Sequence, residues 1–349
     1  MKMTFRWFGQ SDPVRLAYIR QIPGVEGIVG SLFDIPPGVA WTVEQVRALK
    51  DHIEGCGLRL VVIESIPVHE AIKMGRKDRD QYIEAYQHSI RVLGQLGIGV
   101  LCYNFMPVLD WVRTDLQTLL PDGSVVSSYI HEQVAHFDLE RGMREMVAWA
   151  NRFSPEELRA VMNAYREIDE EQLFQNLIYF LQAVAPTAQE SGVKLALHPD
   201  DPPWAVFGLP RIVCDAPGLQ RILDAVPLSA NGLTFCTGAL GALAKNDLPA
   251  MIRQFAGRIH FAHLRNIKRT APQDFHEVAH PSHLGEVDMF EVVRALVEIG
   301  FEGPARPDHG RMIWGETGIP GYGLHDRALG AMYLQGLYEA LYRGRKHTS

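Results

Sequence analysis

Eight short runs rich in β-branched and aromatic residues recur along this 349-residue chain, and a longer amphipathic segment with helical spacing follows each run. This alternation is typical of βα units around a parallel sheet, and eight units predict a (β/α)8 barrel, also called a TIM barrel, of the α/β class. Because 47% of the residues are hydrophobic, the chain can bury one large core, and we expect residues 1–349 to form a single domain. The predicted strands are residues 4–8, 27–33, 58–64, 99–105, 193–198, 232–237, 258–264 and 303–308, and the predicted helices are residues 13–22, 43–57, 79–97, 171–192, 215–226, 246–257, 287–300 and 325–344.

One region, residues 106–170, interrupts the alternation between the fourth predicted strand and its helix. It is far longer than the usual βα loop and contains helical patterns of its own. One of these begins at Ser154, with Glu157 three residues later, which is the spacing of a capping box. Because βα loops emerge at the catalytic face of such barrels, we expect a helical cap over the site. An arm for oligomerisation is the alternative. A second insertion, the polar segment 266–286, is rich in histidine and is expected to be a loop.

Charge and composition exclude several classes of protein. The net charge is −7, acidic and basic residues are interspersed, and no long run of Lys or Arg occurs, so nucleic acid is not expected as a partner. We find no signal-peptide pattern and no stretch of about 18 apolar residues, so we expect a cytoplasmic protein that does not enter a membrane. The four cysteines lack CxxC spacing, which argues against a disulfide framework or a zinc ribbon.

The last four predicted strands each end in a residue that can bind a metal, namely His198, Cys236, His263 and Asp308. The carboxyl ends of barrel strands converge, so these four can become neighbours. Two imidazoles, a thiolate and a carboxylate suit a borderline divalent cation, and zinc, iron and manganese all remain possible. Each residue alone could serve packing or hydrogen bonding, but their joint occurrence favours a metal. Because close-spaced ligand pairs are absent, a catalytic metal is favoured over a structural one.

Other polar or aromatic residues near strand ends are candidates for substrate binding. The guanidinium group of arginine fits a carboxylate, although a surface salt bridge is an equally ordinary use. Asp200 could instead support the neighbouring His198, and His276 could instead lie in a solvated loop. The candidates are Arg6, Trp7, Asn104, Asp200, Arg265, His276 and Arg311.

Motifs along the whole chain, including the long insertion, are similar to those of the D-mannonate dehydratase family. HPDDPP and RPDHG at strand ends are specific signals, whereas FCTG alone would be weak. The motifs are 3-MTFRWFG-9, 64-ESIP-67, 102-CYNFMPVLDWVRTDL-116, 198-HPDDPP-203, 235-FCTG-238, 263-HLR-265, 275-FHE-277, 306-RPDHG-310 and 320-PGY-322.

The resemblance implies a barrel related to xylose-isomerase-like enzymes, a Mn²⁺ or Fe²⁺ cofactor and no organic cofactor. It implies a hydro-lyase of hexuronate catabolism that converts D-mannonate to 2-keto-3-deoxy-D-gluconate and water. The family's metal ligands fall on the same four strand-end residues. Its acid and base fall on His309 and Tyr322, in an order that the sequence leaves open. The apolar segment 332–342 leads us to expect a homodimer or a higher homo-oligomer.

Three positions depart from the family's pattern. Phe8 stands where tyrosine is expected, Ala239 where serine is expected, and Arg311 where histidine is expected. A missing hydroxyl that normally binds a substrate oxygen would change the preference among sugar acids. Two other functions stay open. One is a metal-dependent sugar isomerase or epimerase on the same barrel, and the other is a sugar-acid binding protein without catalysis.

Overall fold

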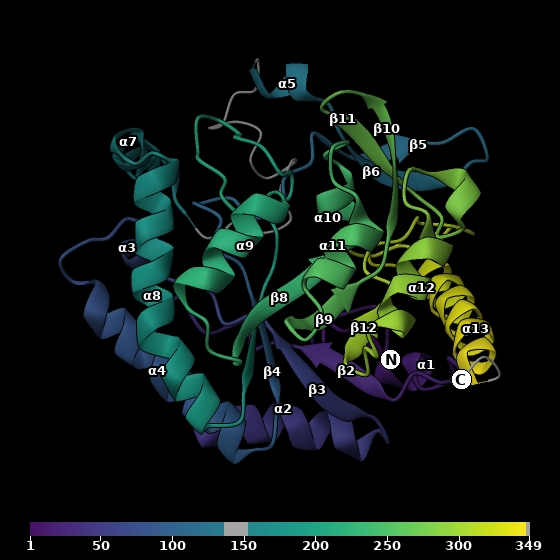
Figure 1. Ribbon diagram of the computed structural model, residues 1–349, viewed down its shortest axis with the longest axis horizontal. Helices are drawn as coiled ribbons and strands as arrows, with labels where there is room; N and C mark the ends of the chain where they lie inside the picture. Colours follow the sequence, from purple (N-terminus) through teal and green to yellow (C-terminus); the bar gives the residue numbers. More distant parts are fainter. Residues whose placement is uncertain (136–152, 347–349) are drawn as a thin grey trace.

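The centre of the molecule is a closed barrel of parallel strands surrounded by helices (Figure 1). The computed structural model describes residues 1–135 and 153–346. The barrel strands follow the order β1-β12-β9-β8-β7-β4-β3-β2, and every neighbouring pair is parallel. The prediction of a (β/α)8 barrel is therefore confirmed.

Each predicted strand overlaps one barrel strand, and each predicted helix overlaps one helix on the outside of the barrel. The barrel strands are β1 (Lys2–Arg6), β2 (Gly27–Gly30), β3 (Arg59–Glu64), β4 (Val100–Tyr103), β7 (Lys194–Leu197), β8 (Asn231–Cys236), β9 (Ile259–His263) and β12 (Pro304–Arg306). The helices around them are α1 (Leu16–Ile19), α2 (Val43–Gly55), α3 (Glu70–Lys73), α4 (Arg79–Gln95), α8 (Glu170–Glu190), α9 (Ala216–Ala225), α10 (Thr237–Gly241), α11 (Leu248–Gln254), α12 (Met289–Glu298) and α13 (His325–Lys346).

Helix α2 shows how local sequence sets the boundaries of these elements. The side chain of Thr42 accepts a hydrogen bond from the backbone N–H of Gln45, and the side chain of Gln45 accepts one from the backbone N–H of Thr42. This capping box satisfies donors that the first turn of a helix leaves unpaired. After the helix, Gly57 adopts a φ of 75°, which a residue without a Cβ reaches at little cost.

The barrel interior is filled by side chains that alternate along the strands with those facing the helices. Val29, Val62, Val100 and Phe261 belong to this inner cluster and are buried. Phe261 packs edge-on against the ring of His263, with ring centroids 4.5 Å apart. The apolar interior thus directly supports the polar groups at the carboxyl end of the barrel.

A second sheet of four strands lies beyond the carboxyl ends of the barrel strands, in the order β10-β11-β6-β5 (Figure 1). Strands β5 (Asp115–Leu119) and β6 (Val125–Tyr129) come from the inserted region, so its description as purely helical was incomplete. Strands β10 (Asn266–Ala271) and β11 (Asp274–Val278) lie in the segment expected to be a loop, and that expectation was wrong. These strands are short, β5 and β10 are partly exposed, and the pair β6–β11 joins segments distant in sequence, so local patterns did not reveal them.

The inserted region also contains helix α5 (His131–Ala135), helix α7 (Pro155–Ala164) and the short 3₁₀ helix η2 (Tyr165–Glu167). The predicted capping box of Ser154 and Glu157 is confirmed at the start of α7. Residues 136–152 lie outside the described residues, and the role of this region as a cap stays a prediction. A further 3₁₀ helix, η3 (Ser282–Leu284), follows β11.

The apolar segment 332–342 lies on α13, where Leu334 packs into the core while Met332 and Tyr342 are exposed. The expected oligomer stays a prediction. None of the described helices combines the length and the apolar character that a membrane span requires.

Candidate active site and metal centre

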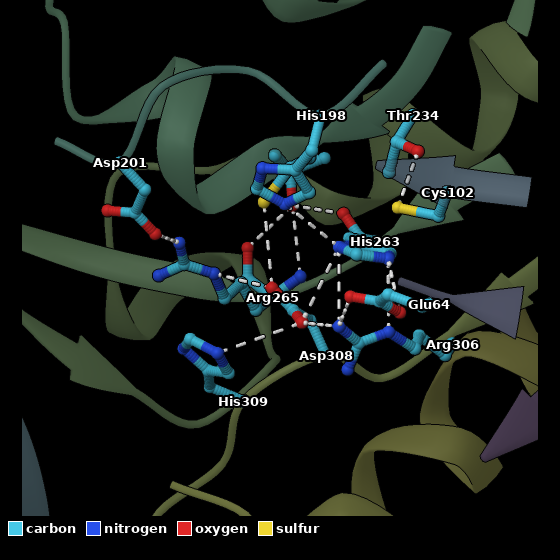
Figure 2. Close-up of polar contacts among 12 residues, drawn as sticks. Glu64, Cys102, His198, Asp201, Thr234, His263, Arg265, Arg306, Asp308 and His309 are labelled. Carbon is cyan, nitrogen blue, oxygen red and sulfur yellow. Dashed lines mark hydrogen bonds and ion pairs between the residues drawn. The ribbon is translucent and has the colours of Figure 1, made fainter. Parts of the chain in front are cut away.

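Four potential metal ligands lie close together at the carboxyl end of the barrel, and Figure 2 shows three of them, His198, His263 and Asp308. The ligand atoms of His198, Cys236 and His263 all lie within 4.8 Å of one another. The carboxylate of Asp308 adjoins them, with Oδ2 3.5 Å from the sulfur of Cys236 and Oδ1 3.6 Å from Nδ1 of His263. Strands β7, β8, β9 and β12 therefore bring the four predicted residues together.

Hydrogen bonds orient the two imidazoles of this cluster. Nδ1 of His198 lies 2.6 Å from the carbonyl oxygen of Pro199, which leaves Nε2 directed at Nδ1 of His263, 3.1 Å away. Nε2 of His263 in turn accepts a hydrogen bond from Nε of Arg306 at 3.0 Å and lies 3.5 Å from Oε2 of Glu64. A hydrogen bond at the far nitrogen of a histidine fixes the orientation of its ring. Two imidazole nitrogens, a thiol and a carboxylate in these positions fit a borderline divalent cation.

Two buried arginines balance the acidic charge of the cluster. Nε of Arg265 lies 2.7 Å from Oδ2 of Asp308, and Nη2 of Arg306 lies 2.7 Å from Oδ1 of the same carboxylate. Arg306 also lies 2.9 Å from Oε1 of Glu64. Burial opposes ionisation of Asp308 and Glu64, but the charge of Arg306 outweighs it and keeps both pKa values below their ordinary range. Both carboxylates are therefore anions.

The predicted acid and base, His309 and Tyr322, form a hydrogen-bonded pair beside this cluster. Nε2 of His309 lies 2.8 Å from the hydroxyl of Tyr322, and the ring of Trp111 packs edge-on against the imidazole at 5.0 Å. Burial lowers the pKa of His309 and raises the pKa of Tyr322. At neutral pH the pair is therefore an uncharged imidazole and a protonated phenol.

Arg327, on α13, holds the loop that carries Tyr322. Its guanidinium donates to the carbonyl oxygens of Tyr322 at 2.5 Å, Gly323 at 2.7 Å and Arg6 at 3.1 Å. The group also lies over the ring of Phe5, 4.1 Å from its centroid. One buried side chain thus ties Tyr322 to the end of β1.

A network of four buried charges lies behind His309. Arg113, from the inserted region, donates to Asp201 at 2.7 Å and to Oε1 of Glu277 at 3.0 Å. Arg265 donates to the same two carboxylates, each at 2.5 Å. Oε1 of Glu277 lies 3.3 Å from Nδ1 of His309. The network therefore joins the second sheet to the acid–base pair.

A cavity of about 350 Å³ opens onto His198, Asp308, His309 and Tyr322, a size typical of sites for small molecules. Of the predicted substrate-binding residues, Arg6 and Asn104 line it. The cavity is not lined by the other five, Trp7, Asp200, Arg265, His276 and Arg311. Trp7 stacks on His52, and Asp200 accepts hydrogen bonds from the backbone N–H groups of Ile212 and Val213. Arg265 belongs to the charge network, His276 lies on β11, and Arg311 pairs with Asp326.

The chain matches one protein family over nearly its whole length. A family model described as D-mannonate dehydratase (UxuA) matches residues 1–348. The chain belongs to the D-mannonate dehydratase family. Mannonate dehydratase 2 of Halalkalibacterium halodurans is 52% identical over 343 residues, which cover 98% of this chain and 99% of that protein.

Solved structures agree with membership of the D-mannonate dehydratase family. The crystal structure of mannonate dehydratase from Streptococcus suis serotype 2 is similar with a TM-score of 0.92 and 47% identity, covering 99% of this chain and 96% of that chain. An L-ribulose 3-epimerase structure has a TM-score of 0.56 and 16% identity, covering 99% and 97% of the two chains. The second likeness shows the barrel fold alone.

Of the three departures from the family's pattern, Phe8 is the one that lines the cavity. Its ring packs edge-on against that of Tyr322, with centroids 4.7 Å apart. Ala239 is buried in α10 away from the cavity. Arg311 lies outside the cavity and donates to Asp326 at 2.9 Å and to Asp122 at 2.7 Å.

Several residues of the site received no role from the sequence. Glu64 and Arg306 line the cavity and flank His263, and both lie at strand ends where their positions could have indicated them. Trp111 and Glu277 lie within motifs that the D-mannonate dehydratase family shares, but on segments whose pairing was not foreseen. Arg113, fully buried, gave no local signal because its partners lie 88 and 164 residues away.

Proposed function

We propose that this chain dehydrates D-mannonate to 2-keto-3-deoxy-D-gluconate and water, with a Mn²⁺ or Fe²⁺ ion held by His198, Cys236, His263 and Asp308. The observation that carries the proposal is the His309–Tyr322 pair beside this donor set in one cavity. Membership of the family names the reaction and the substrate.

The reaction removes the proton on C2 of the substrate and the hydroxyl on C3. The C2 proton is weakly acidic although it lies beside the C1 carboxylate, and hydroxide is a poor leaving group unless a proton reaches it. The resulting C2–C3 enol becomes the 2-keto product when C3 gains a proton. The site must therefore supply a base, an acid and stabilisation of negative charge.

The divalent cation would supply electrostatic stabilisation for the negative charge that develops on the carboxylate oxygens as C2 loses its proton. The chain's own contribution is to orient the donors. The carbonyl oxygen of Pro199 accepts from the far nitrogen of His198, and Arg306 donates to the far nitrogen of His263. Arg306 also keeps Asp308 ionised.

We assign the proton transfers to Tyr322 and His309 acting together. The hydroxyl of Tyr322 passes its proton to Nε2 of His309 across the 2.8 Å contact, and its oxygen takes the proton from C2. The resulting imidazolium of His309 delivers a proton to the C3 hydroxyl, which leaves as water. Both side chains then return to their starting states, so one turnover needs no outside acid or base.

Arg6 is the side chain that we propose to bind substrate oxygens. It lines the cavity, and its guanidinium lies over the rings of Phe8 and Phe33 at 4.8 and 5.3 Å. Among the described residues, its Nη1 atom has no hydrogen-bond partner. Leaving a buried donor without a partner costs about 1–3 kcal/mol of free energy. A substrate carboxylate or hydroxyl oxygen that accepts a hydrogen bond from Nη1 of Arg6 would remove this cost and so bind more tightly.

The experiment that tests the proposal strips the purified protein with a chelator, restores Mn²⁺ or Fe²⁺, and supplies D-mannonate with L-gulonate and D-gluconate in parallel. We expect metal-dependent loss of one water from D-mannonate, measured by mass spectrometry. A product with unchanged mass would instead support a sugar epimerase or isomerase. Binding of D-mannonate with no product under any metal would support a sugar-acid binding protein.

A further inference from the structure

Glu277 reaches the proposed acid–base pair from outside the barrel. It lies on β11 in the second sheet, and its side chain is 1% exposed. Its Oε1 atom lies 3.3 Å from Nδ1 of His309, whose other ring nitrogen lies 2.8 Å from the hydroxyl of Tyr322. The imidazole is therefore held between a carboxylate and a phenol.

The partners of the two ring nitrogens decide where the protons lie. Burial opposes ionisation of Glu277, but the charge of Arg265 outweighs it and keeps the pKa of the carboxyl below its ordinary range. An ionised carboxylate can only accept hydrogen bonds, so Nδ1 of His309 carries the proton. Nε2 then has its lone pair free to accept from the hydroxyl of Tyr322. The opposite tautomer would direct a lone pair at the carboxylate and remove the acceptor that Tyr322 needs.

We propose that Glu277 is a positioning residue, which holds the proton on Nδ1 of His309 and stabilises the imidazolium that forms when Nε2 takes the proton of Tyr322. The inference rests on the proposed function, in which this transfer precedes loss of water. The second sheet would then take part in the reaction, because the carboxylate of Glu277 on β11 is hydrogen-bonded to the imidazole of His309, where the positive charge develops.

Asp201 provides a control for Glu277 within the charge network, although Asp201 also lines the cavity and Glu277 does not. Both carboxylates are buried, and both pair with Arg113 and Arg265. Within residues 1–135 and 153–346, no hydrogen bond or ion pair joins Asp201 to His309. Comparing variants of the two carboxylates therefore separates two effects. Both variants remove a charge from the network, but only a change at Glu277 removes the contact with His309.

The kinetic test compares Glu277→Gln with Asp201→Asn, each of which removes one charge while keeping the size of the side chain. We expect Glu277→Gln to lower kcat by about 10- to 100-fold, because the imidazolium loses its counter-charge. KM for D-mannonate should change by less than about threefold, because the change falls on the transition state rather than on substrate binding. Asp201→Asn should lower kcat much less. Equal losses of kcat in the two variants would overturn the proposal.

A second test needs neither turnover nor a change at Glu277. In ¹⁵N-histidine-labelled protein loaded with diamagnetic Zn²⁺ and without substrate, NMR reports which nitrogen of His309 is protonated, and the signals that disappear in His309→Asn assign the residue. We expect protonated Nδ1. Protonated Nε2 in the wild-type protein would overturn the proposal even if D-mannonate is dehydrated. Absence of dehydration with protonated Nδ1 would count against the proposed function instead.

Discussion

Nε2 of His309 and the hydroxyl of Tyr322 lie 2.8 Å apart, although His309 lies three residues after the last barrel strand and Tyr322 lies in the loop before α13. Burial lowers the pKa of His309 and raises the pKa of Tyr322, so both side chains are uncharged at neutral pH. A proton can pass between the two groups before either reacts with substrate. The pair is therefore expected to behave as one functional unit.

Substitution of either member of this pair should remove most of the activity. We expect His309→Asn and Tyr322→Phe each to lower kcat for D-mannonate by about 10²- to 10⁴-fold, the usual contribution of general acid–base catalysis. The double variant should be little slower than the slower single variant, because residues that act as a unit give non-additive losses. Steady-state kinetics of product formation measure this.

Bound metal and the midpoint of thermal unfolding, measured on the same three proteins, serve as controls and should match the wild type. Turnover close to the wild-type rate in either single variant would remove that residue from the mechanism. Fully multiplicative losses would show that the two residues act independently.

Loss of one proposed ligand should weaken metal binding whether or not activity is measured. We expect Cys236→Ser and His198→Asn to bind Mn²⁺ at least about tenfold more weakly, since even changes behind a ligand cost that much. Metal content after dialysis measures this. Cys214→Ser is the control, because Cys214 contacts Asp200 and lies outside the donor cluster. With Co²⁺, the sulfur-to-metal absorption should vanish in Cys236→Ser and persist in Cys214→Ser, and the reverse result would reject the ligand set.

His260 should make the fold less stable in mild acid. Its ring is buried on β9, Nδ1 lies 2.8 Å from the carbonyl oxygen of Leu195, and burial lowers its pKa to about 4. Between that value and about 6.5, the pKa of an unfolded histidine, the unfolded chain binds a proton that the folded chain does not. The free energy of unfolding therefore falls as pH falls through this window, by about 3 kcal/mol in total from this residue.

Urea unfolding at several pH values between 7 and 5 measures this dependence. The slope of stability against pH should decrease in His260→Asn relative to the wild type. His88→Asn removes an exposed histidine of α4 and serves as the control. An unchanged slope in His260→Asn would contradict the prediction.

A methyl group at position 238 should disturb the charge network behind the four potential metal ligands. A Cβ on Gly238 would lie 2.4 Å from the guanidinium carbon of Arg265, which is fully buried and held by three carboxylates. We expect Gly238→Ala to destabilise the protein by roughly 1–3 kcal/mol. Gly336→Ala, on the exposed side of α13 with no atom within 4 Å of the new Cβ, should be neutral or slightly stabilising. Equal midpoints of thermal unfolding for the two variants would contradict this account.

The barrel and its cluster of potential metal ligands were predictable, because both depend on repeated local patterns. Alternating strands and helices set the fold class, and the last four barrel strands each end at, or within two residues of, one of the residues His198, Cys236, His263 and Asp308. Arg265 shows where this reasoning fails. It lies two residues after the end of β9, as a substrate-binding residue could, yet its side chain belongs to the charge network and does not line the cavity.

The barrel, the family and the residue types at the strand ends could be predicted, because each is a property of residues close together in the chain or of a repeated spacing. The pairing of β11 with β6, the contact of Glu277 with His309 and that of Arg113 with Asp201 became visible only in the folded molecule. These contacts join segments separated by tens to hundreds of positions. Which residues pair in these contacts depends on the neutralisation of buried charges and on the register of short strands. Neither can be read from a local sequence pattern.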